Sequence, residues 1–378
     1  MSYFVSDPMV FLIGREYQIV FNTTEPGFGW AMVNGVRYTD SVAGLMRSDR
    51  SVHKVHVPAD ELDRAGCYTV VFQQMLDRLP YYAVRGESEE KTYAFRAPKC
   101  ENGFSLYQIA DTHCAVDVPA EAAKFHGDSL DFLVFNGDIN ESSDTYENFL
   151  TAFRLSEKVT HGERAIIYAR GNHDTRGHHA PELLNYISTD GERTYYTFRT
   201  GALWGLVLDY GEDKPDDSEE YGGVIDFDRF RQEETAWLRE LVRRGSEEYD
   251  AEGVKWRIVI CHVPFNEDMG KSGAKFGIAN ETYNEWVRLV NEMGVDIMLC
   301  GHMHRAYFDL PGDERDFRGQ NFPVAVGSIP VRADKDGHPV YTGMAVDADE
   351  KTIRASIVTS DFAVKDTLTV EIGRRGRA

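Results

Sequence analysis

The sequence has no run of apolar residues long enough to cross a lipid bilayer, which takes about 20 residues as a helix. Its start, MSYFVSDPMVFLIGREYQ, also lacks the basic residues, apolar segment and small-residue cleavage site that make up a secretory signal peptide. We therefore expect a cytoplasmic protein without a membrane partner.

Cysteine is scarce and scattered. The chain of 378 residues has five cysteines, an odd number, and their positions lack the paired spacing of a disulfide framework or a zinc ribbon. We expect reduced thiols at all of them, namely Cys67, Cys100, Cys114, Cys261 and Cys300.

Basic residues are also fewer than acidic residues. The chain has 41 Lys and Arg against 62 Asp and Glu, a formal net charge of -21. Proteins that bind nucleic acids or anionic membranes use Lys and Arg to neutralise phosphates. An acidic chain is a poor candidate for such partners, so we expect no nucleic-acid partner. The composition carries no expectation of oligomeric state.

Residues 1–100 consist of short segments in which apolar and polar residues alternate. The segment EYQIVFN places Tyr17, Ile19 and Phe21 on one face of a strand, and Asn34-Gly35 is typical of a tight hairpin. No helical pattern of usable length interrupts these segments. The pattern predicts an all-β domain of immunoglobulin or fibronectin type over residues 1–100, which we expect to be a structural companion of the following domain rather than a border of its cleft.

Residues 101–378 alternate between strands and helices. The strands are short apolar runs, of the kind that a sheet covered on both faces buries, at 104–110, 131–137, 164–171, 203–209, 256–262 and 295–301. Amphipathic helices are predicted around three apolar stripes, near Phe149, Trp237 and Trp286. Further β segments at 322–330, 352–360 and 366–373 would extend or cover the sheet. The acidic segment YGEDKPDDSEEYGG, residues 210–223, fits a solvated loop better than an active-site lid.

Five of the predicted strands end in residues that can bind a metal ion. The carboxyl ends of strands in an open α/β sheet meet at one edge, so side chains from these loops converge. Burying charge is costly unless the charge is paired or bound to a metal. The sequence therefore predicts a metal site made of Asp111, His113, Asp138, Asn172, His262, His302 and His304. Cys261 and Cys300 adjoin these residues but, by strand alternation, should pack behind the site.

The order of the motifs, D-x-H, G-D, G-N-H-D, H and G-H-x-H, resembles the calcineurin-like metallophosphoesterase family over roughly residues 104–330. The resemblance implies an α/β (α+β) fold, a metallophosphoesterase β-sandwich flanked by helices and preceded by the all-β domain, as in proteins similar to purple acid phosphatases. It also implies a dinuclear site in which Asp138 bridges two ions. One ion would be held by Asp111, His113 and His304, and the other by Asn172, His262 and His302.

The ligand types agree with this function on chemical grounds. Mixed nitrogen and oxygen ligands suit manganese, iron or zinc, as two divalent or mixed-valence ions. Two divalent ions bring a charge of about +4, of which Asp111 and Asp138 neutralise two, so the site stays cationic and attracts a phosphate ester. We expect a phosphomonoester or phosphodiester of a small molecule to be hydrolysed by a metal-bridging hydroxide. The alternatives are a cyclic-nucleotide phosphodiesterase and a binding protein that keeps the metals only for stability.

His173 follows the candidate ligand Asn172, and family resemblance gives it the role of stabilising the transition state or protonating the leaving oxygen. Either role needs an imidazole kept charged by a carboxylate, for which Glu141 and Asp174 are candidates. Asp174 has the alternative role of a helix or turn cap.

The basic residues that follow two of the motifs are candidates for contacts with the substrate. Arg176, His178 and His179 come soon after His173 and either bind the phosphate or leaving group or are exposed loop residues. Lys271 and Lys275, which follow His262, are expected to be solvated.

Overall fold

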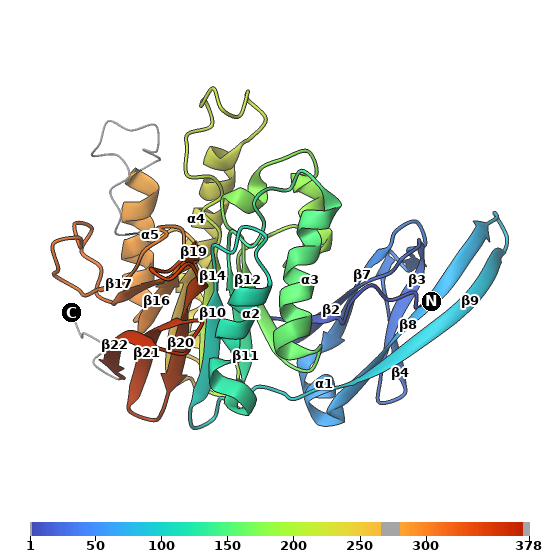
Figure 1. Cartoon of the computed structure of the whole chain (residues 1–378), viewed down its shortest axis with the longest axis horizontal. Coiled ribbons are helices and arrows are strands. Elements are labelled where there is room, and N and C mark those ends of the chain that lie inside the picture. The colour runs from blue at the N-terminus through green and yellow to red at the C-terminus, as the bar shows by residue number, and fades with distance from the viewer. Residues whose placement is uncertain (1, 266–279, 373–378) are drawn as a thin grey trace.

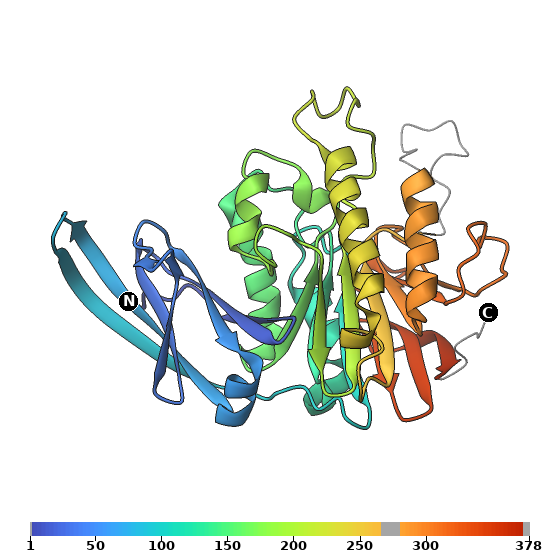
Figure 2. The same ribbon diagram turned by 180° about the vertical axis from the view of Figure 1, so that it is seen from behind.

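A computed structural model describes residues 2–265 and 280–372 of the chain (Figures 1 and 2). The N-terminal β-rich region contains one short helix, α1 (Ala59–Ala65), and the strands β1 (Met9–Ile13), β2 (Glu16–Asn22), β3 (Gly27–Val33), β4 (Val36–Thr39), β5 (Ser41–Val42), β6 (Leu45–Met46), β7 (Val52–Pro58), β8 (Cys67–Arg78) and β9 (Ala83–Ala94). Among the described residues, no helix has both the length and the apolar character needed to cross a membrane.

The rest of the chain forms two sheets with helices outside them. The first sheet contains β10 (Phe104–Ile109), β11 (Phe132–Asn136), β12 (Ala165–Ala169), β19 (Ile329–Ala333), β20 (Pro339–Ala348), β21 (Thr352–Thr359) and β22 (Val364–Glu371). The second contains β13 (Tyr196–Thr200), β14 (Leu203–Leu208), β15 (Trp256–Cys261), β16 (Ile297–Cys300), β17 (Ala306–Asp309) and β18 (Val324–Gly327). The helices are α2 (Asp117–Ala122), α3 (Tyr146–Thr160), α4 (Phe227–Arg243) and α5 (Asn280–Met293), with short 3₁₀ turns η1 (Ala123–Ser129), η2 (His173–Thr175), η3 (Ala180–Asn185) and η4 (Gly245–Glu247).

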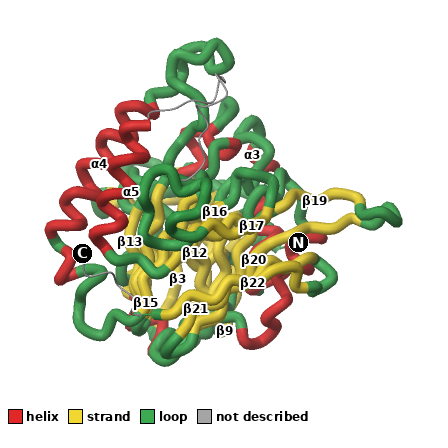
Figure 3. Tube along the Cα trace, turned by 90° about the vertical axis from the view of Figure 1, so that its left-hand side faces the viewer, coloured by secondary structure: helices red, strands yellow, loops and turns green. Residues whose placement is uncertain are grey.

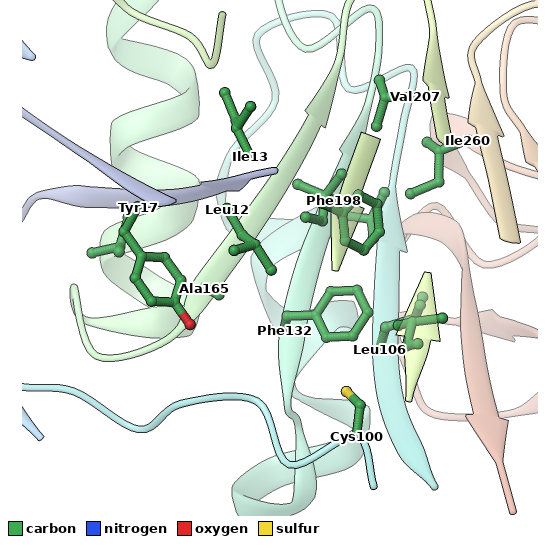
Figure 4. Close-up of a cluster of buried hydrophobic side chains, with 14 of the residues drawn as sticks. Leu12, Ile13, Tyr17, Cys100, Leu106, Phe132, Ala165, Phe198, Val207 and Ile260 are labelled. Atoms are coloured by element: carbon green, nitrogen blue, oxygen red, sulfur yellow. The ribbon is translucent and has the colours of Figure 1, made fainter. Parts of the chain in front are cut away.

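The two sheets pack face to face through one apolar core. Leu106 and Phe132 of the first sheet meet Phe198 and Ile260 of the second in this core (Figure 4). Helix α3 packs on the outer face of the first sheet, while α4 and α5 cover the second, so that strands lie between helices in Figure 3. The predicted β-sandwich flanked by helices is confirmed, and the strands β11, β12, β14, β15 and β16 are buried on both of their faces.

The N-terminal region is the predicted β-sandwich. A four-stranded sheet, β4-β3-β8-β9, packs against β1, β2 and β7. Asn34 and Gly35 form the turn between β3 and β4 with positive φ angles of 48° and 81°, as the hairpin prediction requires. Helix α1 was not predicted, because Leu62 is its only buried side chain and one apolar residue makes no stripe.

The large sheet runs through both parts of the chain. Strand β1 pairs in parallel with β12, with Val10 opposite Ala165 and Phe11 opposite Ile166. The order is therefore β22-β21-β20-β10-β11-β12-β1-β2-β7, and the apolar core is continuous across it. The domain boundary near residue 100 stays a prediction, but the sheet crosses it.

Side chains of the N-terminal strands also hold a loop of the second region. The ammonium of Lys54, on β7, donates to the carbonyl oxygens of Leu184 and Ile187, both at 2.6 Å, and to the hydroxyl of Thr189 at 3.1 Å. Gln18, on β2, exchanges two hydrogen bonds with the backbone of Thr189, at 2.7 and 3.1 Å. These contacts fix the segment 184–189 against the N-terminal region.

We expect Lys54→Met to lower the free energy of unfolding by about 2–4 kcal/mol, because two carbonyls and a hydroxyl lose their hydrogen-bond donor. Urea denaturation measures this change. Lys91→Met is the control, since Lys91 is half exposed and pairs with Asp7 on the surface, where an ion pair contributes about 1 kcal/mol at most. Equal losses in the two variants would contradict the role of Lys54.

Candidate metal centre

The predicted ligands lie in loops at the carboxyl ends of β10, β11, β12, β15 and β16. These loops are packed so closely that position 137 has no room for a side chain, and it is occupied by glycine. A Cβ there would lie 2.4 Å from the His262 ring and 2.7 Å from the Gly171 backbone. The loops also bond to each other through the backbone, as when Asp111 donates to Gly137 at 3.0 Å and His113 to Asp138 at 3.1 Å.

Unusual backbone angles cluster at this place. Six residues with side chains have positive φ angles between 47° and 67°, namely Asp111, His113, Cys114, Asp138, His302 and His304. This region of backbone conformation is unfavourable for residues with a Cβ and persists only where the surroundings impose it. Strain concentrated in this way is typical of a functional site.

A first group of side chains contains Asp111, His113 and His304. The Nε2 atoms of the two imidazoles lie 3.0 Å apart, and Nε2 of His304 lies 3.4 Å from an Asp111 carboxylate oxygen. The three ligand atoms are close enough to bind one metal ion. Asp111 is fixed by the backbone N–H of His302, 3.0 Å away, and by the hydroxyl of Ser328.

A second group contains Asp138, Asn172, His262 and His302. Nε2 of His262 lies 3.2 Å from Asp138 Oδ2. Nδ1 of His302 lies 2.9 Å from the amide oxygen of Asn172. The two groups adjoin each other, because His262 Nε2 is also 3.8 Å from Asp111 Oδ1. The structure thus brings all seven predicted ligands together.

The contacts of the two ring nitrogens of His262 indicate whether these side chains could bind a metal ion. Its Nδ1 lies 2.6 Å from the carbonyl oxygen of Asn136 and must carry the hydrogen that the carbonyl accepts. The other nitrogen, Nε2, is buried without a hydrogen-bond partner and faces Asp111 and Asp138. Between this nitrogen and the two carboxylates a positive charge is needed, which either a proton on Nε2 or a metal ion can supply, so the residues fit a metal ion.

The electrostatics of the centre favour positive charge at the same point. Burial alone would lower the pKa of His262, but the carboxylates of Asp138 and Asp111, together with the hydrogen bond to the Asn136 carbonyl, outweigh burial and raise this pKa to about 10. Burial alone would likewise raise the pKa of Asp138, but the charge of His262 lowers it below its ordinary value. Burial lowers the pKa of His302 to about 4, which leaves its imidazole neutral, as a metal ligand must be.

Comparison with known proteins agrees with this geometry. Residues 104–306, more than half of the chain, match the model of the calcineurin-like phosphoesterase family. The chain belongs to the calcineurin-like phosphoesterase family. Every residue of the two groups lies within the matched range.

Solved structures share the fold. The chain is similar to purple acid phosphatase PPD1 from seeds of yellow lupin (Lupinus luteus), with 12% identity and a TM-score of 0.61 over 97% of this chain and 74% of that one. It is also similar to PhoD, with 11% identity and a TM-score of 0.53 over 96% and 88% of the two chains. At such identities the likeness concerns the fold alone. No curated protein matches the sequence significantly.

His173, for which we expect a catalytic role from the sequence, lies beside the first group. Its ring centroid is 4.7 Å from that of His113, and its backbone N–H donates to Asp138 Oδ1 at 2.8 Å. Its Nδ1 lies 2.9 Å from the backbone carbonyl of Glu141 and 4.0 Å from the Glu141 carboxylate. That carboxylate is closer to His113 Nδ1, at 3.1 Å, so Glu141 adjoins both imidazoles.

Asp174 has a different environment. Its buried carboxylate accepts the backbone N–H groups of Gly171 at 3.0 Å, Asp138 at 3.2 Å and Asn140 at 3.3 Å, and the hydroxyl of Tyr168 at 3.3 Å. Burial, together with the nearby charge of Asp138, raises the pKa of Asp174 to about 6. Of the two roles open to Asp174 in the sequence, these contacts are those of a cap that ties two loops together.

Arg176 and His178 lie farther along the same loop, where Arg176 is bound by acidic residues. Its Nε and Nη2 atoms each donate to Glu212 at 2.7 Å, and Nη2 also lies 3.2 Å from Asp213. His178 is exposed, and its backbone N–H donates to Asp144 at 3.2 Å. These contacts favour a structural role for Arg176 beside the centre rather than a guanidinium left open for phosphate.

Sequence reasoning missed Glu212 and Asp213. The prediction of a solvated loop over residues 210–223 is wrong for its first part, because Tyr210, Glu212, Asp213 and Lys214 are buried. Asp213 Oδ2 lies 3.9 Å from Nε2 of His302. The available signal was position, since these residues follow the end of β14 just as the ligands follow their strands.

The cysteines lie where alternation predicts. Cys261 and Cys300 are buried in the apolar cluster between the second sheet and helices α4 and α5, behind the metal centre. All five cysteines are free thiols in this structure. Lys271 and Lys275 lie outside the described residues.

Proposed function

We propose that the chain is a metal-dependent phosphoesterase that hydrolyses phosphomonoesters or small phosphodiesters at a site for two metal ions. The observation that carries the proposal is the convergence of seven ligand-type side chains from five loops, with a buried histidine nitrogen facing two carboxylates. Family membership supports the same chemistry.

The two ions would be divalent or of mixed valence, drawn from manganese, iron and zinc, because the donors are imidazole nitrogens and oxygens without thiolates. We assign one ion to Asp111, His113 and His304, the other to Asn172, His262 and His302, and the bridge to Asp138. When bound, such a pair supplies an activated water and positive charge for the phosphoryl oxygens.

The chain's own residues account for the remaining steps. With Nδ1–H directed at the Glu141 carbonyl, His173 keeps Nε2 for the exchange of a proton with the leaving oxygen. The Glu141 carboxylate lies 4.0 Å from Nδ1 of the same imidazole. The acidic surface does not oppose a small anionic substrate, because charges more than about 10 Å away are screened by salt.

The test is turnover of p-nitrophenyl phosphate and of its bis ester after loading with Mn²⁺, alongside metal analysis. We expect hydrolysis of at least one ester by protein that contains two ions per chain. The ratio of the two rates separates a monoesterase from a diesterase. Absence of turnover for both esters, with both ions bound, would reject the proposal.

We expect His173→Gln to lower kcat by about 10²-fold while metal content stays the same, because general acid catalysis contributes about 10²–10⁴-fold and the backbone contact with Asp138 survives. The control is His338→Gln, whose side chain is exposed in the turn between β19 and β20. A protein that keeps the metals only for stability would show no difference between the two variants.

A further inference from the structure

A cavity of about 970 Å³ opens at Thr175, two residues beyond His173. One wall is the loop that follows His173, and it includes Thr175, Arg176 and Leu184. The opposite wall comes from the segment between β14 and α4 and from the first turn of α4. A cavity of this size can bury a substituent as large as a typical ligand.

Residues of the cavity wall are neighbours of residues of the centre. Thr175 ends the short turn η2 that His173 begins. Arg176, which lines the cavity, contacts Asp213, and Asp213 in turn lies 3.9 Å from the candidate ligand His302. A group attached to a phosphate at the metal centre therefore has this cavity next to it.

The cavity wall is largely apolar. Phe227 and Phe230 lie side by side in α4, with ring centroids 5.8 Å apart, and the guanidinium of Arg170 packs 5.6 and 5.4 Å from these rings. Leu184 and Val224 extend the apolar surface, and Val224 is 83% exposed. Apolar side chains open to solvent in a concave site favour an apolar ligand group.

The arginine and lysine side chains on the cavity wall are already paired with carboxylates. Arg170 lies 2.8 Å from Asp209, and Arg176 makes its two hydrogen bonds with Glu212. Lys214 lies 3.3 Å from Asp213 and 3.2 Å from Glu220. A second anionic group on the substrate, such as a further phosphate, would have to compete with these carboxylates.

We infer that the cavity receives the alcohol part of the substrate and selects an uncharged, apolar or aromatic group. This inference rests on the proposed function, since it assigns a substrate class to the same centre. The wall that includes Leu184 is held in place by Lys54 of the N-terminal strands, which makes the cavity preformed rather than dependent on the ligand.

The test compares alkyl esters, whose leaving groups have similar intrinsic reactivity. We expect kcat/KM of the Mn²⁺-loaded protein to rise from ethyl to butyl to hexyl phosphate, by about tenfold or more over the series, because each buried methylene favours binding. Glycerol 3-phosphate, polar and of similar length to butyl phosphate, should be the poorer substrate of that pair. A flat series, or a preference for glycerol 3-phosphate, would overturn the inference while leaving the proposed function intact.

A substitution in the cavity wall tests whether the preference for longer alkyl esters arises in this cavity. Val224→Asp places a charge on the cavity wall at an exposed position where folding tolerates it, and we expect the ratio of hexyl to ethyl turnover to fall at least about fivefold. The matched control is Val364→Asp on β22, whose valine is 51% exposed and lies outside the cavity. Equal ratios in the two variants would place the alkyl chain elsewhere and overturn the inference.

The binding of substrate analogues that are not hydrolysed tests the cavity assignment independently of catalysis. Hexylphosphonate should bind the Mn²⁺-loaded protein at least about tenfold more tightly than ethylphosphonate in calorimetry. If no ester is hydrolysed but this difference is found, the cavity assignment stands and the proposed function fails. Equal affinities would overturn the cavity assignment whatever the turnover.

Discussion

Asp138→Asn should abolish most of the activity, lowering kcat/KM on the order of 10³-fold and removing at least one metal ion per chain. The side chain is buried, and its Oδ2 lies 3.2 Å from His262 while its Oδ1 accepts the backbone N–H of His173 at 2.8 Å. Asparagine keeps the shape but removes the negative charge that would lie between two cations. Steady-state kinetics and metal analysis of the same preparation measure both effects.

The control for this change is Asp366→Asn, on the exposed strand β22, where the same loss of charge should leave both quantities unaltered. An Asp138→Asn protein that keeps two ions and stays within tenfold of the original kcat/KM would contradict the role of Asp138 as a bridge. Full metal content with low activity would instead mean that the carboxylate acts on the substrate side.

Asp174→Ala should have the largest effect on stability, lowering the free energy of unfolding by about 4 kcal/mol. Its carboxylate accepts three backbone N–H groups from the two loops that carry Asp138 and Asn172. Alanine leaves these donors buried and without an acceptor, at a cost of about 1–3 kcal/mol each. Urea denaturation of the metal-free protein gives the change without a contribution from ion binding.

Asp174→Asn serves as the graded variant, because its amide keeps one oxygen acceptor and should lose about half as much stability as alanine. It also covers the case in which the alanine protein does not fold. If Asp174 acted as the partner of His173 instead, the asparagine variant would lose turnover while its stability stayed unchanged.

The site could be predicted from the sequence because its geometry follows from the strands. Asp111, Asp138 and His262 were selected from local patterns, because each follows the carboxyl end of a buried strand. The sequence did not show that β10 and β11 belong to one sheet and β15 to another, so that the packing of two sheets brings these residues together. The same reasoning does not predict the order of the strands in the sheet. Pairing of β1 with β12 joins residues more than 150 positions apart, and the run MVFLI fits any buried strand.

The carboxylates around the centre were harder to assign. Glu141 and Asp174 were both plausible partners of His173, and only the folded chain shows that one lies against two imidazoles while the other caps backbone N–H groups. Glu212 and Asp213 lie in a strongly acidic segment, whose composition favours solvent. Their burial depends on Arg176, 36 residues earlier, which no local pattern links to them.

The pairing of β1 with β12 has a consequence for how the chain can be divided. A protein shortened to begin at residue 101 would present β12 as a sheet edge with unpaired backbone donors and acceptors, and such an edge recruits strands from other molecules. By covering the edge of β12, strand β1 therefore prevents self-association. A fragment made without residues 1–100 should be expressed with a substitute strand, or with charged residues that face outward from β12.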